Sequence, residues 1–337
     1  MRKAVGVSSF LIAEPSMKAL AKLLALCIFC AWCGAAAAQT YPVKSVRFIV
    51  PNGAGSSPDV VARLVAERLS RRLGQQFLVE NNIAGAGLVG AQLAAKAPPD
   101  GYTLFMGSAS AMASNLVMFK SLPYDPRKDF VPVAGLVDNG PYVLAVHPDV
   151  PVKSFGEWVA LAKSRPGKLS FAADAGLAGI IGRWLNKTAG IDVVHVPYKA
   201  IPPSVQDTAG GRVEMILISP IAIAPFTSSG KLRIIAITSG KRFPGMESIP
   251  TIAETLPGFQ IGGWFLLAAP TGTPGEITQR LNREVDTYLK EPEIIERLRN
   301  FGFSTSGAGT LQSLQEFIRS ERARWVRIAK EVGVEPQ

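Results

Sequence analysis

The residues of this chain that could do chemistry are small and mostly uncharged, and they gather in short loops after apolar runs. Examples are Pro51 to Ser57 (PNGAGSS), Gly107 to Ala111 (GSASA) and Ala172 to Gly176 (AADAG). Where such a loop leads into a helix, free backbone N–H groups and the positive end of the helix dipole can hold a carboxylate without a charged side chain. The pattern favours reversible capture of an anion, although each loop taken alone could be only a short strand-to-helix connection.

The familiar patterns of catalytic and metal-binding residues are missing from the sequence. Past residue 38 the chain has no cysteine and only two histidines, His147 and His195, each of which fits a structural or surface position better than a ligand position. The chain contains no H-E-x-x-H, no G-x-S-x-G and no G-x-x-x-x-G-K-[ST]. We therefore expect no enzymatic activity, no metal site and no cofactor.

One cofactor motif does match, because Gly85 to Gly90 reads G-A-G-L-V-G ahead of a helix-forming stretch. In a dinucleotide site the strand turns directly into these glycines, whereas here five residues separate them from the apolar run Phe77 to Val79. No acidic residue follows about 20 positions later to hold a ribose. Tight turning and close helix packing are the favoured roles of these glycines, and a dinucleotide-dependent oxidoreductase is the disfavoured alternative.

The loops recur within a repeated order of apolar run, small-residue loop and helix. Runs with the composition of strands are Ser45 to Val50, Thr103 to Met106, Leu169 to Phe171, Val193 to Val196 and Met215 to Ile218. Ser57 is expected to cap a helix in which Pro58 takes the first position. The alternation predicts an α/β fold with mostly parallel sheets, in which ligands bind outside the carboxyl ends of the strands.

Two extended stretches, Pro141 to His147 and Trp264 to Ala269, divide the chain into three parts. They predict a middle domain inserted into a discontinuous outer one. The outer lobe would comprise residues 39–142 and 265–337, and the inner lobe residues 143–264, with two crossing strands between them.

The first 38 residues are typical of an export signal. After Met17 come two lysines, Lys18 and Lys22, and an apolar stretch from Leu20 to Trp32, and Ala36 with Ala38 offers an A-x-A cleavage site. This stretch is too short for a spanning helix, which needs about 20 residues. All three cysteines lie in the segment. We expect residues 1–38 to be removed, with translation starting at Met17, and the mature protein to be soluble in the periplasm without disulfides.

Composition and charge limit the remaining function classes. The 337 residues are 47% hydrophobic and 18% charged, which suits about two domains. The formal charge of +10 falls to +7 once the signal, with four basic residues and one acidic residue, is removed. No basic run carries interleaved aromatic residues, so nucleic acid is not an expected partner. The densest basic stretch, Arg319 to Lys330, is expected to be the solvated face of an amphipathic helix.

Short motifs follow one another in order from Tyr41 to the C-terminus. They are Val50-Pro51 with its Gly/Ser loop, Asp59 to Arg63 (DVVAR), Val79 to Asn81 (VEN), Pro99 to Leu104 (PDGYTL), Leu122 to Pro126 (LPYDP), Val194 to Lys199 (VHVPYK), Gly230 to Arg233 (GKLR), Pro250 to Glu254 (PTIAE) and Ala269 to Pro274 (APTGTP). In this order the chain resembles the Bug family, the extracytoplasmic solute receptors of tripartite tricarboxylate transporters.

The resemblance implies the two-lobed, type II-like fold of periplasmic binding proteins, in which two α/β lobes hinged by two crossing strands close on a small organic carboxylate. The ligand-binding residues expected by position are Gly53, Ala54, Gly55, Ser56, Ser57, Asp59, Gly107, Ser108, Ala109, Ser110, Ala172, Ala173, Asp174, Tyr198, Lys199 and Ser219. The resemblance also implies delivery of the ligand to integral-membrane permease subunits. We expect a monomer, and an alternative hypothesis replaces the permease with a membrane sensor protein.

The chain departs from the family pattern at three places in the expected site. Asn52 stands where the family has an aromatic residue, Asp174 lies in a replaced inner loop, and Ile218 stands where the family has an acid. A carboxylate at Asp174 would repel an anion unless the ligand brings an amine or the side chain points away. We therefore expect a less polar or amine-bearing carboxylate as an alternative to the common dicarboxylate ligand.

Overall fold

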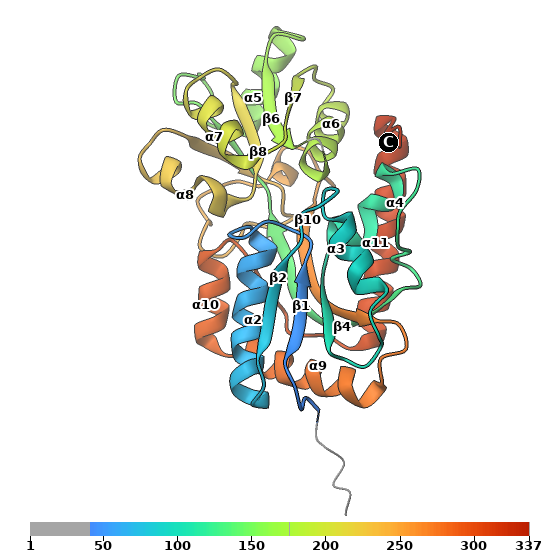
Figure 1. Ribbon diagram of the computed structural model, residues 1–337. Helices are drawn as coiled ribbons and strands as arrows, with labels where there is room; N and C mark the ends of the chain where they lie inside the picture. The colour runs from blue at the N-terminus through green and yellow to red at the C-terminus, as the bar shows by residue number, and fades with distance from the viewer. Residues whose placement is uncertain (1–40, 175, 337) are drawn as a thin grey trace, which may run out of the picture. The chain divides into compact units, whose positions relative to one another are not determined.

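The computed structural model describes residues 41–174 and 176–336 (Figure 1). The expected export signal, with its cleavage site and cysteines, lies outside these residues. Residues from Lys44 onward form one packed unit. No helix in the described ranges is both long enough and apolar enough to cross a membrane.

The first of two five-stranded sheets takes its strands from distant parts of the chain. Its order is β2-β1-β3-β10-β4. The strands are β1 (Val46–Val50), β2 (Phe77–Asn81), β3 (Thr103–Ser108), β4 (Phe130–Pro141) and β10 (Gly262–Pro270). β1 runs parallel to β2 and β3, whereas β10 runs antiparallel to β3 and β4. The late strand β10 therefore occupies an interior position in a sheet that the N-terminal strands begin.

The helices that accompany the first sheet come from both ends of the described chain (Figure 1). They are α2 (Ser57–Leu73), α3 (Leu88–Ala95), the π-helix η1 (Ser110–Ser114), α4 (Asn115–Met118), α9 (Gly275–Leu289), α10 (Pro292–Asn300) and α11 (Leu311–Val332). α2 packs on β1 and β2, α9 packs on β4 and α2, and α11 packs on β4 and η1. The long C-terminal helix α11 also contacts helix α6 of the second sheet, residues Leu177–Ala189.

The second sheet has the order β7-β6-β8-β5-β9. Its strands are β5 (Val143–Val146), β6 (Ser170–Asp174), β7 (Val194–Tyr198), β8 (Met215–Ile218) and β9 (Arg233–Ile237). Its helices are α5 (Phe155–Ser164), α6, α7 (Ile201–Ala209) and α8 (Pro220–Ser228), followed by the 3₁₀ helix η2 (Ile252–Glu254). β6 runs parallel to β7 and β8, and β5 runs antiparallel to β8 and β9.

The expectation of mostly parallel sheets is wrong, because each sheet contains two parallel and two antiparallel pairings. The antiparallel pairings all involve β10 or β5. β5 follows β4 directly through one residue, Tyr142. Two strands run parallel when a crossover connection, usually a helix, returns the chain to the same end of the sheet. β5 has no such connection before it, because it enters the second sheet directly from β4.

Large aromatic side chains fill the interior beside both sheets. Phe48 and Phe105 of the first sheet and Phe171 of the second are fully buried, as are Trp158 of α5 and Trp325 of α11. Burying one such side chain stabilises the fold by roughly 1.5–3 kcal/mol. The apolar runs read from the sequence therefore form the cores that hold the strand ends in place.

Helix α2 begins one residue away from the expected arrangement. Ser56, with φ of −71° and ψ of 161°, is the N-cap, and the helix spans Ser57–Leu73. Pro58 still lies in the first turn, where its missing N–H costs no hydrogen bond. The Ser56 side chain does not cap the helix but donates to the carbonyl of Gly53 at 2.6 Å, so the expected cap at Ser57 is wrong by one residue.

The Gly85 to Gly90 segment packs tightly against the end of β1. Gly87 has φ of +86°, and a Cβ there would lie 2.3 Å from the carbonyl oxygen of Pro51. A Cβ at Gly90 would lie 2.9 Å from the carbonyl oxygen of Asn82. These close approaches require glycine and let α3 pack on β1 and β3, which agrees with the packing role expected from the sequence.

Candidate functional site

The candidate site lies where loops from the two sheets approach each other. Ser57 follows β1 at the start of α2, and Ser219 follows β8 as the N-cap of α8. Their Oγ atoms lie 3.4 Å apart, although 162 positions separate them in the chain. Two of the loops singled out by their small residues, one from each sheet, therefore meet at this point.

The loop before α2 presents unpaired backbone donors. The N–H of Ser56 donates to the carbonyl of Gly53 at 3.1 Å, and the N–H of Val60 donates to the carbonyl of Ser56 at 3.0 Å. Within the described residues, the backbone N–H groups of Ser57 and Asp59 have no hydrogen-bond partner. These donors stand at the positive end of the α2 dipole, where an anion is stabilised.

The buried Asp59 side chain links this loop to neighbouring residues of α2 and β2. Its side chain is 3% exposed and accepts hydrogen bonds from the N–H of Gly55 at 2.8 Å, from Asn81 at 2.9 Å and from Arg63 at 3.1 Å. Burial raises the pKa of Asp59, but the hydrogen bonds from Arg63, Gly55 and Asn81 together lower it below its ordinary value. The carboxylate is thus already fully bonded, which assigns Asp59 a positioning role in the predicted site.

Ser219 presents the matching helix start on the second sheet. Its hydroxyl makes no cap bond to its own helix and faces Ser57 instead. Its carbonyl accepts the N–H of Ala222 at 3.1 Å, and Pro220 has no N–H to satisfy. Ser219 therefore keeps a hydroxyl available to a molecule bound near Ser57.

The predicted loop Gly107 to Ala111 is mostly regular structure, which corrects the expectation. β3 continues through Ser108, and η1 begins at Ser110. Ser108 is 8% exposed and accepts the N–H of Ala111 at 3.2 Å, and Ala109 is 2% exposed. Ser110 is partly exposed, so it is the residue of this group whose hydroxyl remains accessible.

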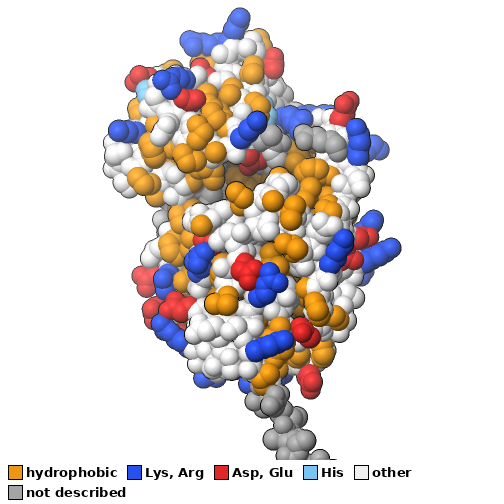
Figure 2. All heavy atoms as spheres, viewed as in Figure 1, with side chains coloured by type: hydrophobic (Ala, Val, Ile, Leu, Met, Phe, Trp, Pro, Cys, Tyr) orange, Lys and Arg blue, Asp and Glu red, His pale blue; other side chains and the backbone are white. Residues whose placement is uncertain are grey.

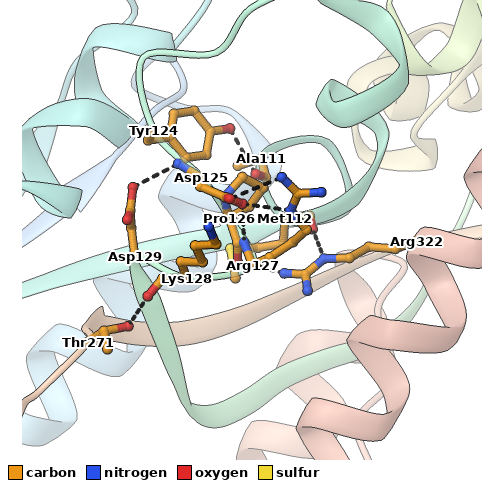
Figure 3. Close-up of polar contacts among 10 residues, drawn as sticks. All are labelled: Ala111, Met112, Tyr124, Asp125, Pro126, Arg127, Lys128, Asp129, Thr271 and Arg322. Carbon is orange, nitrogen blue, oxygen red and sulfur yellow. Dashed lines mark hydrogen bonds and ion pairs between the residues drawn. The ribbon is translucent and has the colours of Figure 1, made fainter.

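A network of polar contacts fixes η1 to the loop before β4 and to α11 (Figure 3). Tyr124 donates its hydroxyl hydrogen to the carbonyl of Ala111 at 2.8 Å. The Arg322 guanidinium donates to the carbonyls of Met112 and Pro126 at 2.9 and 2.6 Å. Burial raises the pKa of Tyr124 to about 12, so the hydroxyl remains a donor at neutral pH. The LPYDP motif thus serves to place η1 and, with it, Ser110.

The residues predicted on the inner side lie in strand β6 rather than in a loop, which is a second correction. The side chains of Ala172 and Ala173 are 0% and 3% exposed. They belong to the core and leave only backbone groups for contact. Asp174 ends the strand with an exposed side chain, so the carboxyl edge of β6 presents a carboxylate.

The Asp174 carboxylate lies against the first turn of α6. Burial by the surrounding protein raises the pKa of Asp174, while backbone hydrogen bonds from Gly176, Ala178 and Gly179 lower it in part. The side chain is nevertheless open to water. Figure 2 shows the molecule hollowed about midway along this face, with acidic side-chain atoms in the hollow.

Tyr142 is part of this region and was not recognised in the sequence. It lies between β4 and β5, where its N–H donates to Oγ1 of Thr238 and its carbonyl accepts the N–H of Thr238, both at 2.9 Å. Burial raises the pKa of Tyr142, and the negative charge of Asp174 raises it further. The sequence feature that could have indicated Tyr142 is its place as an aromatic residue in the extended stretch Pro141 to His147, where a crossing between the lobes is expected.

Tyr198 and Lys199 stand at the edge of the second sheet. β7 continues through Tyr198, where a loop was expected from Pro197. The Tyr198 hydroxyl donates to Asp207 of α7 at 2.7 Å. Lys199 is exposed and takes part in no ion pair among the described residues. The Tyr198 hydroxyl is therefore hydrogen-bonded to α7. Contact of Tyr198 or Lys199 with a ligand stays a prediction.

Asn52 and Ile218 are the other departures from the family pattern. Asn52 is partly buried and Ile218 is buried. Asn52 accepts a hydrogen bond from Asn81 on its carbonyl at 2.9 Å, and its buried Oδ1 has no hydrogen-bond partner in the part of the chain that the structure describes. Ile218 is 7% exposed at the end of β8, in the core beside Val143. Neither residue adds a charge to the region around Ser219.

Two cavities lie elsewhere, along α11. The first, of about 320 Å³, is lined by Ser320, Glu321, Ala323, Arg324 and Arg327. The second, of about 280 Å³, is lined by residues of α11, by Met112 and by the segment around Pro126. No cluster of three or more His, Cys, Asp or Glu side chains suited to a metal ion is found within residues 41–174 and 176–336.

The two-sheet arrangement has counterparts among known proteins. Residues 61–334 match the tripartite tricarboxylate transporter family receptor. The chain belongs to this family. It is a solute receptor with the two-sheet fold of periplasmic binding proteins, not an enzyme. The oxidoreductase alternative for Gly85 to Gly90 is thereby set aside.

Solved structures resemble the receptor over most of its length. Rpa4515 of R. palustris, determined with adipate, is 35% identical with a TM-score of 0.81, covering 88% of this chain and 100% of that one. The periplasmic binding protein BugD is 28% identical with a TM-score of 0.77, covering 88% and 100%. MatC of Rhodopseudomonas palustris, with bound malate, is 30% identical with a TM-score of 0.74, covering 86% and 99%.

Proposed function

We propose that the receptor captures a small organic carboxylate between the loops of its two sheets and delivers it to the permease subunits of a tripartite tricarboxylate-type transporter. The observation that carries this proposal is the approach of Ser57 and Ser219 to 3.4 Å. It brings together two helix starts that offer hydroxyl groups and unpaired backbone N–H groups. Such donors hold a carboxylate reversibly, without covalent chemistry.

The relatives support the same ligand class. Rpa4515 was determined with adipate and MatC with malate, and both ligands are carboxylates. The permease partner is proposed from the family name, and the periplasmic location from relatives such as BugD that are periplasmic binding proteins. In this receptor the expected contacts narrow to Ser57, Ser110 and Ser219 with the loop Gly53 to Ser56, while Asp59 positions them.

We also propose that the two sheets belong to two lobes, residues 39–142 with 265–337 and residues 143–264. The first sheet takes no strand from between Pro141 and Gly262, and all strands of the second lie within this interval. Two hydrogen bonds, from the Tyr142 N–H to Oγ1 of Thr238 and from the Thr238 N–H to the Tyr142 carbonyl, tie the crossing from β4 to β5 to the end of β9, and the Thr238 carbonyl accepts the N–H of Ile261 just before β10. Rotation about these crossings would open and close the gap between Ser57 and Ser219.

The test measures ligand binding in matched variants. The mature protein, starting at Gln39, is titrated with adipate and malate by calorimetry, and thermal unfolding is followed in parallel because a bound ligand raises the midpoint. Ser219→Tyr places a large side chain where Ser57 approaches. It should raise Kd at least about ten-fold, because the two helix starts can no longer meet around the ligand.

Ser228→Tyr, at the exposed far end of the same helix, is the control and should change Kd less than about two-fold. Absence of binding by every carboxylate tested would contradict the proposed function. Equal binding by the Ser219 and Ser228 variants would contradict the placement of the site.

A further inference from the structure

Asp174 fills a position that a ligand carboxylate would otherwise take. The start of a helix is a natural anion site, because its first N–H groups are unpaired. At the start of α6, the backbone N–H groups of Gly176, Ala178 and Gly179 lower the pKa of Asp174, as donors that face a carboxylate do. A Cβ built on Gly176 would lie only 2.9 Å from Oδ1 of Asp174, so the side chain lies close to this turn. The first turn of α6 therefore already faces a carboxylate of the protein itself.

The carboxylate of Asp174 has no cationic partner within the described residues. No ion pair includes it, in contrast to Asp59, Asp125 and Asp207, which are each paired with an arginine. The neighbouring hydroxyl, from Tyr142, is neutral. The ring of His195 lies against the same turn, 2.6 Å from a Cβ built on Gly179, and burial together with Arg183 keeps its pKa low, which leaves it uncharged.

Asp174 nevertheless remains open to solvent at the carboxyl end of β6. The ends of β6 and β8 belong to the same edge of the second sheet, because the two strands are parallel neighbours. Ser219 follows β8 directly. A molecule held between Ser57 and Ser219 therefore lies beside the carboxyl ends of β6 and β8, where Asp174 is exposed.

We propose that this receptor selects a carboxylate that also carries a cationic group, such as an ammonium, and that Asp174 binds that group. The inference rests on the proposed function, which places the ligand carboxylate at the loop before α2. An ammonium beside Asp174 supplies the missing counter-charge. A second carboxylate at the same place would meet a like charge at the start of α6.

The test compares ligands that have the same number of carbon atoms and differ at one end. Adipate carries two carboxylates, ε-aminocaproate carries a protonated aminomethyl group in place of one of them, and caproate carries a methyl group there. Succinate, γ-aminobutyrate and butyrate form a shorter series. We expect the amino acid of at least one series to bind about ten-fold or more tightly than its two counterparts by calorimetry.

Asp174→Asn keeps the shape of the side chain and removes its charge, so it should abolish this preference. Asp149→Asn removes a charge from a side chain that is 91% exposed beyond the far end of β5, and it should leave the preference unchanged. Circular dichroism of both variants verifies folding.

The outcomes separate the two proposals. Tighter binding of a dicarboxylate than of the matching amino acid, equal binding of the amino acid and its methyl counterpart, or a preference that persists in Asp174→Asn would overturn the role of Asp174 while leaving carboxylate capture intact. Failure of all six compounds to bind would overturn the proposed function itself.

Discussion

Two aspartates near strand ends of the receptor differ in how the fold treats their charge. Asp59 is buried beneath its loop, yet hydrogen bonds from Arg63, Gly55 and Asn81 outweigh burial and hold its pKa below the ordinary value. Asp174 is open to solvent, and burial of its surroundings outweighs three backbone donors and raises its pKa. One carboxylate is therefore stabilised as an anion by the fold itself, whereas the other is left in need of a counter-charge.

The difference predicts a pH-dependent effect of Asp174→Asn on stability. Because folding raises the pKa of Asp174, its contribution to stability is full below the ordinary value near 3.9 and is lost as the pH rises through the raised pKa. Removing the charge should therefore raise the thermal midpoint by roughly 1–3 °C at pH 7 and have little effect near pH 3. Differential scanning calorimetry of the ligand-free protein measures both.

The other groups facing Asp174 do not reproduce this pH profile. Tyr142 stays protonated across the range, and the lowered pKa of His195 would make acid destabilise the variant and the parent protein alike. Asp149→Asn is the control. A variant that gains as much stability at pH 3 as at pH 7 would show that lost charge is not the cause.

At the scale of elements, the sequence predicts well where strands and helices occur and less well at which residue each of them ends. The run Met215 to Ile218 is strand β8 as predicted, because four buried apolar residues between polar flanks allow little else. β6 continues through Asp174 and β7 continues through Tyr198, although the sequence predicts loops from Ala172 and from Pro197. Their lengths are set by pairing with each other, and the Ala173–Pro197 and Asp174–Tyr198 pairs depend on a register that neither run reveals alone.

The candidate site was predicted in part. Ser57 and Ser219 could be found from small residues placed before a helix, a pattern visible in a single stretch of sequence. Tyr142 could not be assigned to it, because its relation to Asp174 depends on the crossing between sheets rather than on any local pattern. The hydrogen bond from Asn81 to Asp59 is likewise a tertiary contact, whereas the Asp59–Arg63 pair joins residues four positions apart within α2.

The glycines before α3 provide a prediction about element packing. Gly87→Ala places a Cβ 2.3 Å from the Pro51 carbonyl oxygen in a left-handed backbone conformation. It should lower the free energy of unfolding by roughly 2–4 kcal/mol, since both strain and a backbone clash are introduced. Urea unfolding monitored by circular dichroism measures the change.

Gly74→Ala is the matched comparison for this packing effect. Gly74 has a similar φ of +72° with no atom within 4 Å of a built Cβ, so only the conformational cost of about 1 kcal/mol is expected. Equal losses in the two variants would mean that the contact with Pro51 contributes nothing.

At the scale of the whole molecule, α11 contacts elements of both sheets. It packs on β4 of the first sheet, and near its end Glu331 accepts a hydrogen bond from Nε1 of Trp184 in α6 at 2.8 Å. Lys187 of α6 also donates to the carbonyl of Glu331. Trp184 in turn stacks on Phe259, with ring centroids 4.3 Å apart, in the segment that leads back to β10. Movement between the sheets must therefore strain or break the Trp184–Glu331 contact.

Glu331→Ala should loosen this connection. It removes the acceptor of Trp184 and should lower the free energy of unfolding by about 1 kcal/mol. Hydrogen exchange of the α6 amides should become faster, because that helix loses its tie to α11. Glu335→Ala, exposed and outside every ion pair of the described residues, should change neither quantity. Unchanged exchange in α6 after Glu331→Ala would show that the contact does not restrain the helix.

The interior position of β10 determines when the first sheet can be completed. A chain that emerges from its N-terminus, from a ribosome or through a translocation pore, delivers β1 to β4 early, but β10 must enter between β3 and β4. Until residue 270 has emerged, β3 has an unpaired edge and β4 has no partner strand, and unpaired strands promote aggregation. A product truncated before Gly262 would therefore be a substrate for chaperones and proteases rather than a half-folded receptor.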